Sequence, residues 1–150
     1  KIEKLVLGLT GTRLGEEGRK NIQRWIELLQ RNKERKFFSR AVKDTFEGPK
    51  KLFYRTGSSV LWRKFSRPST EDLIACARAC LEHDTTPDTL DIDPDTMVIG
   101  AQKDSFFPRE VISETSQKIG AETRYINGGH AAFHQNSSEF HDEARRFFDR

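Results

Sequence analysis

The sequence predicts an α/β protein whose short parallel strands are separated by helices, with a long helical segment inserted after the first strand. Three short apolar runs have the length and residue types of buried strands, namely Leu5–Leu7, Thr96–Gly100 and Thr123–Ile126. Helical periodicity fills most of the remaining chain. Because residues 96–150 alternate strand, helix, strand and helix, they are typical of a parallel α/β unit.

The first strand, Leu5–Leu7, runs into a glycine-containing turn at Gly8–Gly11. All three strand residues are apolar, which indicates a strand covered on both faces. A globular protein rarely begins with such a central strand, so we expect the chain to be a piece of a longer protein. Residues 1–12 form the first predicted unit, a core strand.

Residues 13–90 form the second predicted unit, a helical segment. Its first helix spans Glu16–Asn32 and its second helix spans Glu34–Thr45, each with apolar residues on one face. A third segment covers Pro49–Phe65. A fourth helix begins at Ser69, which is a suitable N-cap because an acidic residue follows three positions later.

Residues 91–150 form the third predicted unit, a C-terminal α/β core. Its first strand leads to a helix that starts at Pro108 and stops at Gly120, which are the residue types preferred at these two helix ends. Its second strand leads through a turn to a last helix, for which Asn136 and Glu139 are expected to form the cap.

Charge is distributed unevenly along the chain. Residues 13–67 contain 16 Lys and Arg against 6 Asp and Glu, a net charge of +10, whereas residues 68–150 contain 8 against 16, a net charge of −8. The basic half can attract an anionic ligand or surface. We expect no nucleic acid as a partner, because the basic stretch contains no recognised nucleic-acid motif and its aromatic residues follow apolar periodicities.

The composition also argues against several classes of protein. No run approaches the ~18 apolar residues that a membrane-spanning helix needs, and the charged first residues do not form a secretory signal. Cys76 and Cys80 are expected to be reduced core residues on one helix face, because no second Cys or His pair completes a zinc site. Reduced cysteines predict a cytoplasmic protein.

Polar residues with catalytic potential follow the second and third predicted strands. Asp104 lies in the loop after one strand and His130 in the loop after the next. Ligands of open parallel sheets bind beyond the carboxyl ends of the strands, so we expect these side chains to meet. A carboxylate that fixes the imidazole tautomer is the partner that a general base requires. Phe106, Phe107 and Phe133 can line an apolar substrate pocket or pack in the core.

The residues around this pair resemble the C-terminal half of the α/β hydrolase family. The resemblance rests on two strings, Val98-Ile99-Gly100-x-x-x-Asp104-x-x-x-Pro108 and Gly128-Gly129-His130-Ala131-Ala132-Phe133. In that family the acid of the Ser-His-Asp triad follows the seventh strand and the histidine follows the eighth. The resemblance therefore implies that Asp104 is the acid, His130 the general base, the first strand the family's sixth, and residues 16–83 its lid. Residues 9–12 contain no carboxylate, which favours Asp104 over the position that some members use.

The resemblance implies a serine-type hydrolase that acts on an ester, an amide or a related acyl bond of a small-molecule substrate. The family's nucleophile lies in a Gly-x-Ser-x-Gly turn, which this sequence lacks. We therefore expect as partner the N-terminal half of the same fold or a second copy, which would also cover the open edges of the first two strands. The alternative is a non-catalytic α/β-hydrolase-like module that binds an anionic partner through its basic helical layer.

Three other motifs are incomplete. Gly8–Gly15 follows a strand and precedes a helix but matches neither nucleotide-binding glycine pattern. Asp91–Asp95 imitates the start of a calcium loop without its glycine and final glutamate. His130 and His134 have the spacing of zinc ligands on a helix but lack the glutamate after the first histidine, so His134 is interpreted as a pocket-rim or helix-start residue. We expect no cofactor and no metal.

Overall fold

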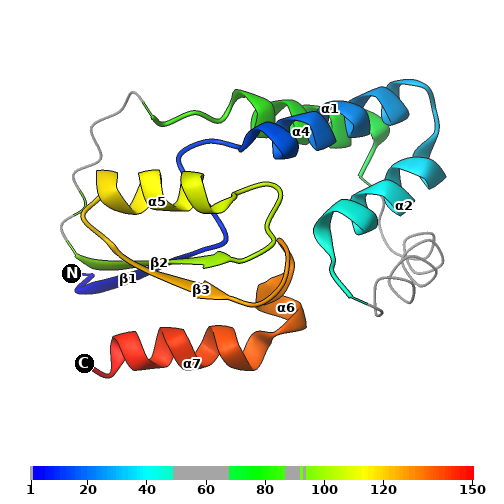
Figure 1. The fold of residues 1–150 in the computed structure, drawn as a ribbon. Helices are drawn as coiled ribbons and strands as arrows, with labels where there is room; N and C mark the ends of the chain where they lie inside the picture. The colour runs from blue at the N-terminus through cyan, green and yellow to red at the C-terminus, as the bar shows by residue number, and fades with distance from the viewer. Residues whose placement is uncertain (1, 49–67, 87–91, 93) are drawn as a thin grey trace.

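The computed structural model of the chain describes residues 2–48, 68–86, 92 and 94–150. In chain order, the described elements are β1 (Lys4–Gly8), α1 (Glu16–Gln30), α2 (Glu34–Thr45), α4 (Thr70–Glu82), β2 (Asp95–Ala101), α5 (Arg109–Lys118), β3 (Glu122–Ile126), α6 (Ala132–Gln135) and α7 (Ser137–Phe148) (Figure 1). The predicted fold class is confirmed, and each predicted strand and helix within the described residues is present. The predicted segment Pro49–Phe65 lies outside them. Sequence analysis did not anticipate the short helix α6.

The three strands form one parallel sheet in the order β1-β2-β3. Helix α5 covers one face of this sheet and α7 covers the other (Figure 1). Because β2 lies between two strands and two helices, all its residues after Asp95 are buried. The carboxyl ends of the strands point toward the helices α1, α2 and α6 (Figure 1).

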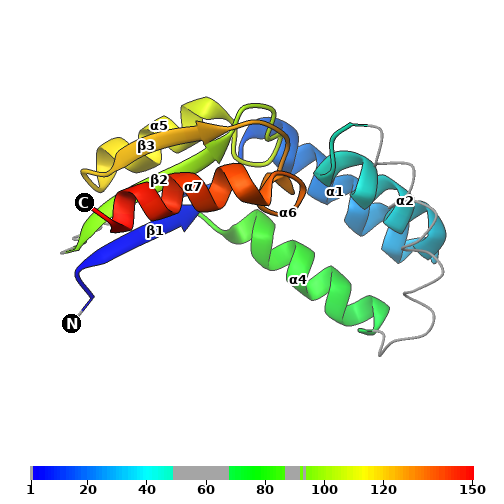
Figure 2. The ribbon, with the colours of Figure 1, turned by 90° about the horizontal axis from the view of Figure 1, so that it is seen from below.

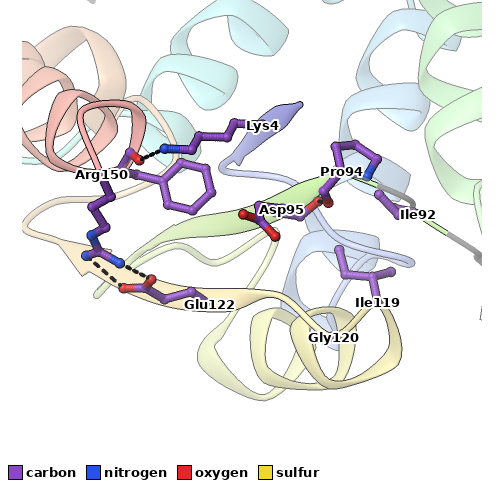
Figure 3. A pocket seen from close by; sticks show the side chains of 10 residues that line it. Lys4, Ile92, Pro94, Asp95, Ile119, Gly120, Glu122 and Arg150 are labelled. Atoms are coloured by element: carbon purple, nitrogen blue, oxygen red, sulfur yellow. Dashed lines mark hydrogen bonds and ion pairs between the residues drawn. The ribbon is translucent and has the colours of Figure 1, made fainter. Parts of the chain in front are cut away.

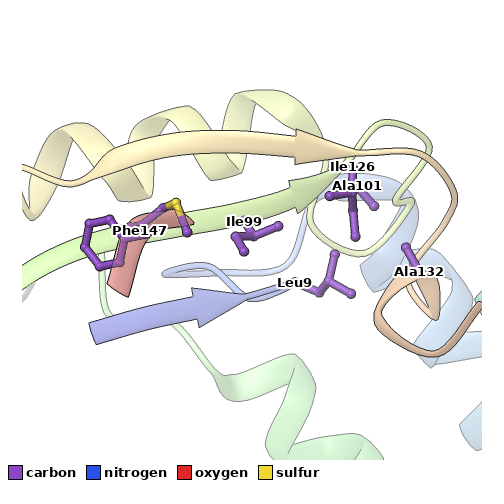
Figure 4. Packing of buried hydrophobic residues seen from close by; sticks show 7 residues of the cluster. Leu9, Ile99, Ala101, Ile126, Ala132 and Phe147 are labelled. Atoms are coloured by element: carbon purple, nitrogen blue, oxygen red, sulfur yellow. The ribbon is translucent and has the colours of Figure 1, made fainter. Parts of the chain in front are cut away.

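The main hydrophobic core lies between the sheet and α7. Its buried members are Leu9, Met97, Ile99, Ala101, Ile126, Ala132 and Phe147 (Figure 4). Alternate residues of a strand point to opposite faces of the sheet, so Met97, Ile99 and Ala101 face α7 together. Val98, which lies between them in the sequence, is also fully buried. Both faces of β2 therefore contribute to the packed interior.

A second core joins α1 and α4 to the loop after β2. Its buried members are Leu14, Ile22, Ala77 and Phe106. The expected burial of the two cysteines is wrong, because both Cys76 and Cys80 are exposed. Helix α4 contributes Ala77 to the buried members of this core, and its Leu81 packs against them.

The predicted helix caps differ in their outcome. At α4 the capping box is confirmed: Ser69 Oγ accepts from Asp72 N at 3.0 Å, and Asp72 Oδ2 accepts from Ser69 N at 3.1 Å. At α7 Asn136 is the N-cap residue as expected, but its side chain makes no cap hydrogen bond there. Glu139 instead accepts from the backbone N–H and the side-chain amide of Asn127, at 3.1 and 3.2 Å. The Glu139 carboxylate thus binds the donors of the turn after β3 and does not cap α7.

In the described part of the chain, no helix has the length and apolar character needed to cross a membrane.

Strand β1 is the outer strand of the sheet on the side where α4 lies (Figure 2). In the sheet that the described residues form, β2 is paired on both sides, so of the first two strands only β1 has an open edge. Glu3 O accepts from Asp95 N, and Leu9 N donates to Ile99 O. Alternate residues of a parallel pair bond to the same neighbour, so the backbone groups of Val6 face the open edge.

We expect this open edge to pair with a further strand, from the N-terminal half of the fold or from a second copy. Val6→Pro removes an N–H on the open side and leaves the bonds to β2 intact. This substitution should weaken association in light scattering. Leu5→Pro is the matched control, because it removes a bond to β2 and should instead lower stability. Wild-type chain that stays monomeric at every concentration would contradict the expectation.

Candidate active site

The candidate site lies where the loops after β2 and β3 meet. Two backbone hydrogen bonds join these loops, from Gln102 N to Ile126 O at 3.0 Å and from Lys103 N to Gly128 O at 2.9 Å. Adjacent parallel strands end at the same edge of the sheet, which explains why the two loops are neighbours. The loops bring together Asp104 and His130, the two residues singled out from the sequence.

The Asp104 carboxylate is fully buried and has a partner on each oxygen. Its Oδ2 lies 2.9 Å from Nδ1 of His130. Its Oδ1 accepts two backbone hydrogen bonds, from Phe106 N at 2.8 Å and from Phe107 N at 3.1 Å. A buried carboxylate needs such partners because burying an unpaired charge costs several kcal/mol. The contact expected between Asp104 and His130 is therefore present, with the acid held by its own loop.

The His130 ring is positioned for proton transfer at its second nitrogen. With Nδ1–H donated to Asp104, the neutral ring carries its lone pair on Nε2. Among the residues that the structure describes, none forms a hydrogen bond with Nε2. The rings of Phe106 and Phe107 lie beside the imidazole, with centroid distances of 4.8 and 5.7 Å. These two aromatic rings restrict the imidazole while 30% of its side chain stays accessible.

A cavity of 330 Å³ adjoins His130, and we call it the α1–α4 cavity. It is lined by Leu14, Ile22, Trp25, Cys80, His83, Phe106, Phe107 and His130. Two of the three phenylalanines expected near the pair line it, whereas Phe133 is 56% exposed and lies outside this lining. His83 is exposed, and its Nε2 lies 3.1 Å from the carbonyl oxygen of Gly11.

The other histidines are placed differently. His134 lies in α6 and His141 in α7, and both are exposed. Neither lines the α1–α4 cavity. His134 is therefore not at the rim of this cavity, whereas His130 lines it and contacts a buried carboxylate.

The start of α1 packs directly on the loop after β2, which carries Asp104 and which we call the acid loop. Gly15 N donates to Phe106 O at 2.8 Å. A Cβ atom placed on Gly18 would lie only 2.7 Å from the Cα atom of Phe106. No side chain fits at that distance, so the glycine allows the helix and the loop to approach.

The end of α2 is bonded to the segment after β3 that carries His130. Thr45 O accepts from Ala131 N at 3.0 Å. The Gln135 side chain accepts from Glu47 N at 3.0 Å and donates to Glu47 O at 2.8 Å. Sequence analysis missed Gln135 and Glu47, because a glutamine that bonds to a distant backbone leaves no local sequence signal.

A second cavity, of 490 Å³, lies at the opposite, amino-terminal edge of the sheet (Figure 3). Three of its charged side chains, Lys4, Glu122 and Arg150, have partners within the protein. Arg150 donates to both oxygens of Glu122, at 2.6 and 3.3 Å, and these bonds hold the pKa of Glu122 below its ordinary value. Lys4 Nζ donates to the carbonyl oxygens of Phe147 and Phe148. This larger cavity is remote from Asp104 and His130. The α1–α4 cavity is lined by His130 itself and is therefore the candidate substrate site.

Within residues 2–48, 68–86, 92 and 94–150, no group of three His, Cys, Asp or Glu side chains could hold a metal ion.

Comparison with solved structures assigns the fold to a known class. The α/β hydrolase MGS-M2 from a Medee basin deep-sea metagenome library superimposes with a TM-score of 0.80 at 15% identity. The enol-lactonase from Burkholderia xenovorans LB400 gives 0.80 at 16% identity, and the esterase EaEST from Exiguobacterium antarcticum gives 0.74 at 17%. Each match covers 99% of this chain and 57% of the other chain. No protein-family model and no curated protein sequence matches.

The chain therefore has the fold of the C-terminal half of an α/β hydrolase, as the sequence resemblance implied. It spans a little over half the length of the solved enzymes that it matches.

Gly18→Ala tests the packing of α1 on the acid loop. Alanine in a helix is usually more stable than glycine by ~0.5–1 kcal/mol. Here we expect the free energy of unfolding to fall by about 1–3 kcal/mol, because the new methyl group overpacks against backbone that cannot rotate away. Urea denaturation measures this change. Arg19→Ala, at the exposed neighbouring position, is the control and should change stability little. An increase in stability for Gly18→Ala would contradict the packing described.

Proposed function

We propose that the chain supplies the acid and the general base of a serine-type hydrolase that acts on esters, amides or related acyl bonds. Nε2 of His130 accepts the proton of a serine hydroxyl as the serine oxygen attacks the acyl carbon, and later returns the proton to the leaving group. Asp104 holds the Nδ1–H and stabilises the imidazolium that forms. The 2.9 Å contact of His130 with a fully buried carboxylate is the observation that carries this proposal.

The serine and the oxyanion-hole donors belong, in this proposal, to the part of the α/β hydrolase fold that these 150 residues do not include. Two observations support this. The chain spans 57% of the solved enzymes, and it contains no Gly-x-Ser-x-Gly turn. The missing part can be an N-terminal segment of the same polypeptide, a separate chain or a second copy. A small molecule is the proposed substrate.

We assign the lid to residues 13–90, of which α1, α2 and α4 are described, and the core to residues 1–12 and 91–150. The proposal is supported by the walls of the α1–α4 cavity, which α1 and α4 share with the loop that carries Asp104. A cytoplasmic location is part of the same proposal, since both cysteines are free thiols, which persist in reducing compartments.

The alternative function, a module that binds an anionic partner through its basic helices, needs neither the contact between Asp104 and His130 nor the cavity beside them. Hydrolysis uses both features. It is therefore the function that the site supports better.

Substitution of the pair tests the proposal in the protein at the full length that its gene encodes. Asp104→Asn and His130→Ala should each lower kcat for p-nitrophenyl butyrate by about 10³–10⁴, as expected for triad members. Asp142→Asn and His141→Ala are matched controls, because both residues are exposed and remote from the cavity lining. Folded variants of the pair with wild-type turnover would refute the proposed function.

The isolated 150-residue chain should not hydrolyse activated esters faster than its own His130→Ala variant, because it carries no serine in a Gly-x-Ser-x-Gly turn. Release of p-nitrophenol gives the rate, and mass spectrometry detects any acyl adduct. Steady turnover through an acylated residue of this chain would show that the nucleophile is already present.

A further inference from the structure

The α1–α4 cavity has a chemical character that the proposed reaction leaves open. No Lys, Arg, Asp or Glu is among the described residues that line it. Its titratable side chains are His83, His130 and Cys80. The lining is otherwise aromatic and aliphatic, and the volume of 330 Å³ is at the lower end of the ~300–1,000 Å³ typical of small-molecule sites. Such a space suits one compact apolar group.

The aromatic walls of this cavity are fixed by contacts outside it. The indole N–H of Trp25 donates to Asp44 Oδ2 at 3.0 Å, which directs the polar edge of the ring toward α2. The Trp25 ring packs on Phe106 and Phe37, with centroid distances of 5.4 and 5.9 Å. Phe106 is 3% exposed and belongs to the second core. Because these rings are packed on several sides, the cavity wall is largely preformed.

We propose that the α1–α4 cavity selects an uncharged aryl or short alkyl group of the substrate and places it beside His130. This proposal rests on the proposed function, because it makes the cavity the specificity pocket of the same reaction. The described lining contains no Lys, Arg, Asp or Glu, so a carboxylate or ammonium group in this position would lose its hydration without a salt bridge to such a residue. An apolar group gains from leaving water.

Helix α4 offers a matched pair of positions for the test. Cys80 lines the cavity, whereas Cys76, one helical turn earlier, does not. Both residues are exposed and free, so each can be alkylated or replaced without disturbing the core. The alkylation rate of Cys80 therefore reports on occupancy of the cavity. The alkylation rate of Cys76 is the control for effects of the probe that do not involve the cavity.

The experiment uses the protein at its full encoded length with two probes of nearly equal shape. Benzylacetone is an uncharged ketone that cannot be hydrolysed, and hydrocinnamate carries a carboxylate in place of its methyl ketone. Alkylation by iodoacetamide, in which the thiolate displaces iodide, is followed at each cysteine by mass spectrometry. Benzylacetone should slow alkylation of Cys80 in a saturable manner and leave Cys76 unchanged. Hydrocinnamate should need at least about tenfold higher concentration for the same protection.

A pair of filling substitutions checks the location independently. Cys80→Phe places a ring at the cavity wall and should abolish benzylacetone binding in ligand-observed NMR. Cys76→Phe adds the same ring one turn away and should bind as the wild type does. Equal binding by the two variants, equal affinity for the two probes, or absence of Cys80 protection would overturn the proposal. The last outcome includes the case in which another part of the protein fills the cavity.

Failure of this proposal can be told apart from failure of the proposed function, because benzylacetone binding requires no nucleophile. If Cys80 is protected while Asp104→Asn and His130→Ala retain full esterase activity, the triad assignment is wrong. If those two variants are inactive while Cys80 is not protected, the triad stands and the specificity pocket lies elsewhere.

Discussion

The site depends on the hydrogen bonds of the buried Asp104 carboxylate, because each of its oxygens needs a donor when water is excluded. Oδ1 takes the two backbone N–H groups of Phe106 and Phe107, and Oδ2 takes the ring of His130. Hydrogen bonds to a charged acceptor are stronger than those between neutral groups. The same three bonds thus set the curvature of the loop after β2 and the orientation of the ring after β3.

The helical segment is connected to the same loops. Phe106 presents its carbonyl oxygen to Gly15 at the start of α1 and its ring to the core between α1 and α4. On the other side, Gln135 and the backbone of Ala131 hold the end of α2. Because α1 and the loop after β2 both line the cavity, a shift of that loop would also move part of the cavity wall. The geometry of the pair and the shape of the cavity are consequently coupled.

The apolar surroundings of His130 also bear on its chemistry. Electrostatic interactions are stronger where water is excluded. An imidazolium that forms beside Phe106 and Phe107 has little solvent on those sides, so its stabilisation comes chiefly from the Asp104 carboxylate. The 2.9 Å contact between His130 and Asp104 therefore holds the two loops together and is also needed by the proposed base.

The sequence by itself determined the strands, most helices and the meeting of Asp104 with His130. Those features follow from local periodicity and from the rule that adjacent parallel strands end together. Only the tertiary structure decided that Cys80 faces a cavity, that Glu139 bonds to Asn127, and that Gln135 holds Glu47. The reason is physical: periodicity states which residues share a helix face, whereas the neighbour that covers that face, or the donor that takes a side chain, depends on segments distant in the chain.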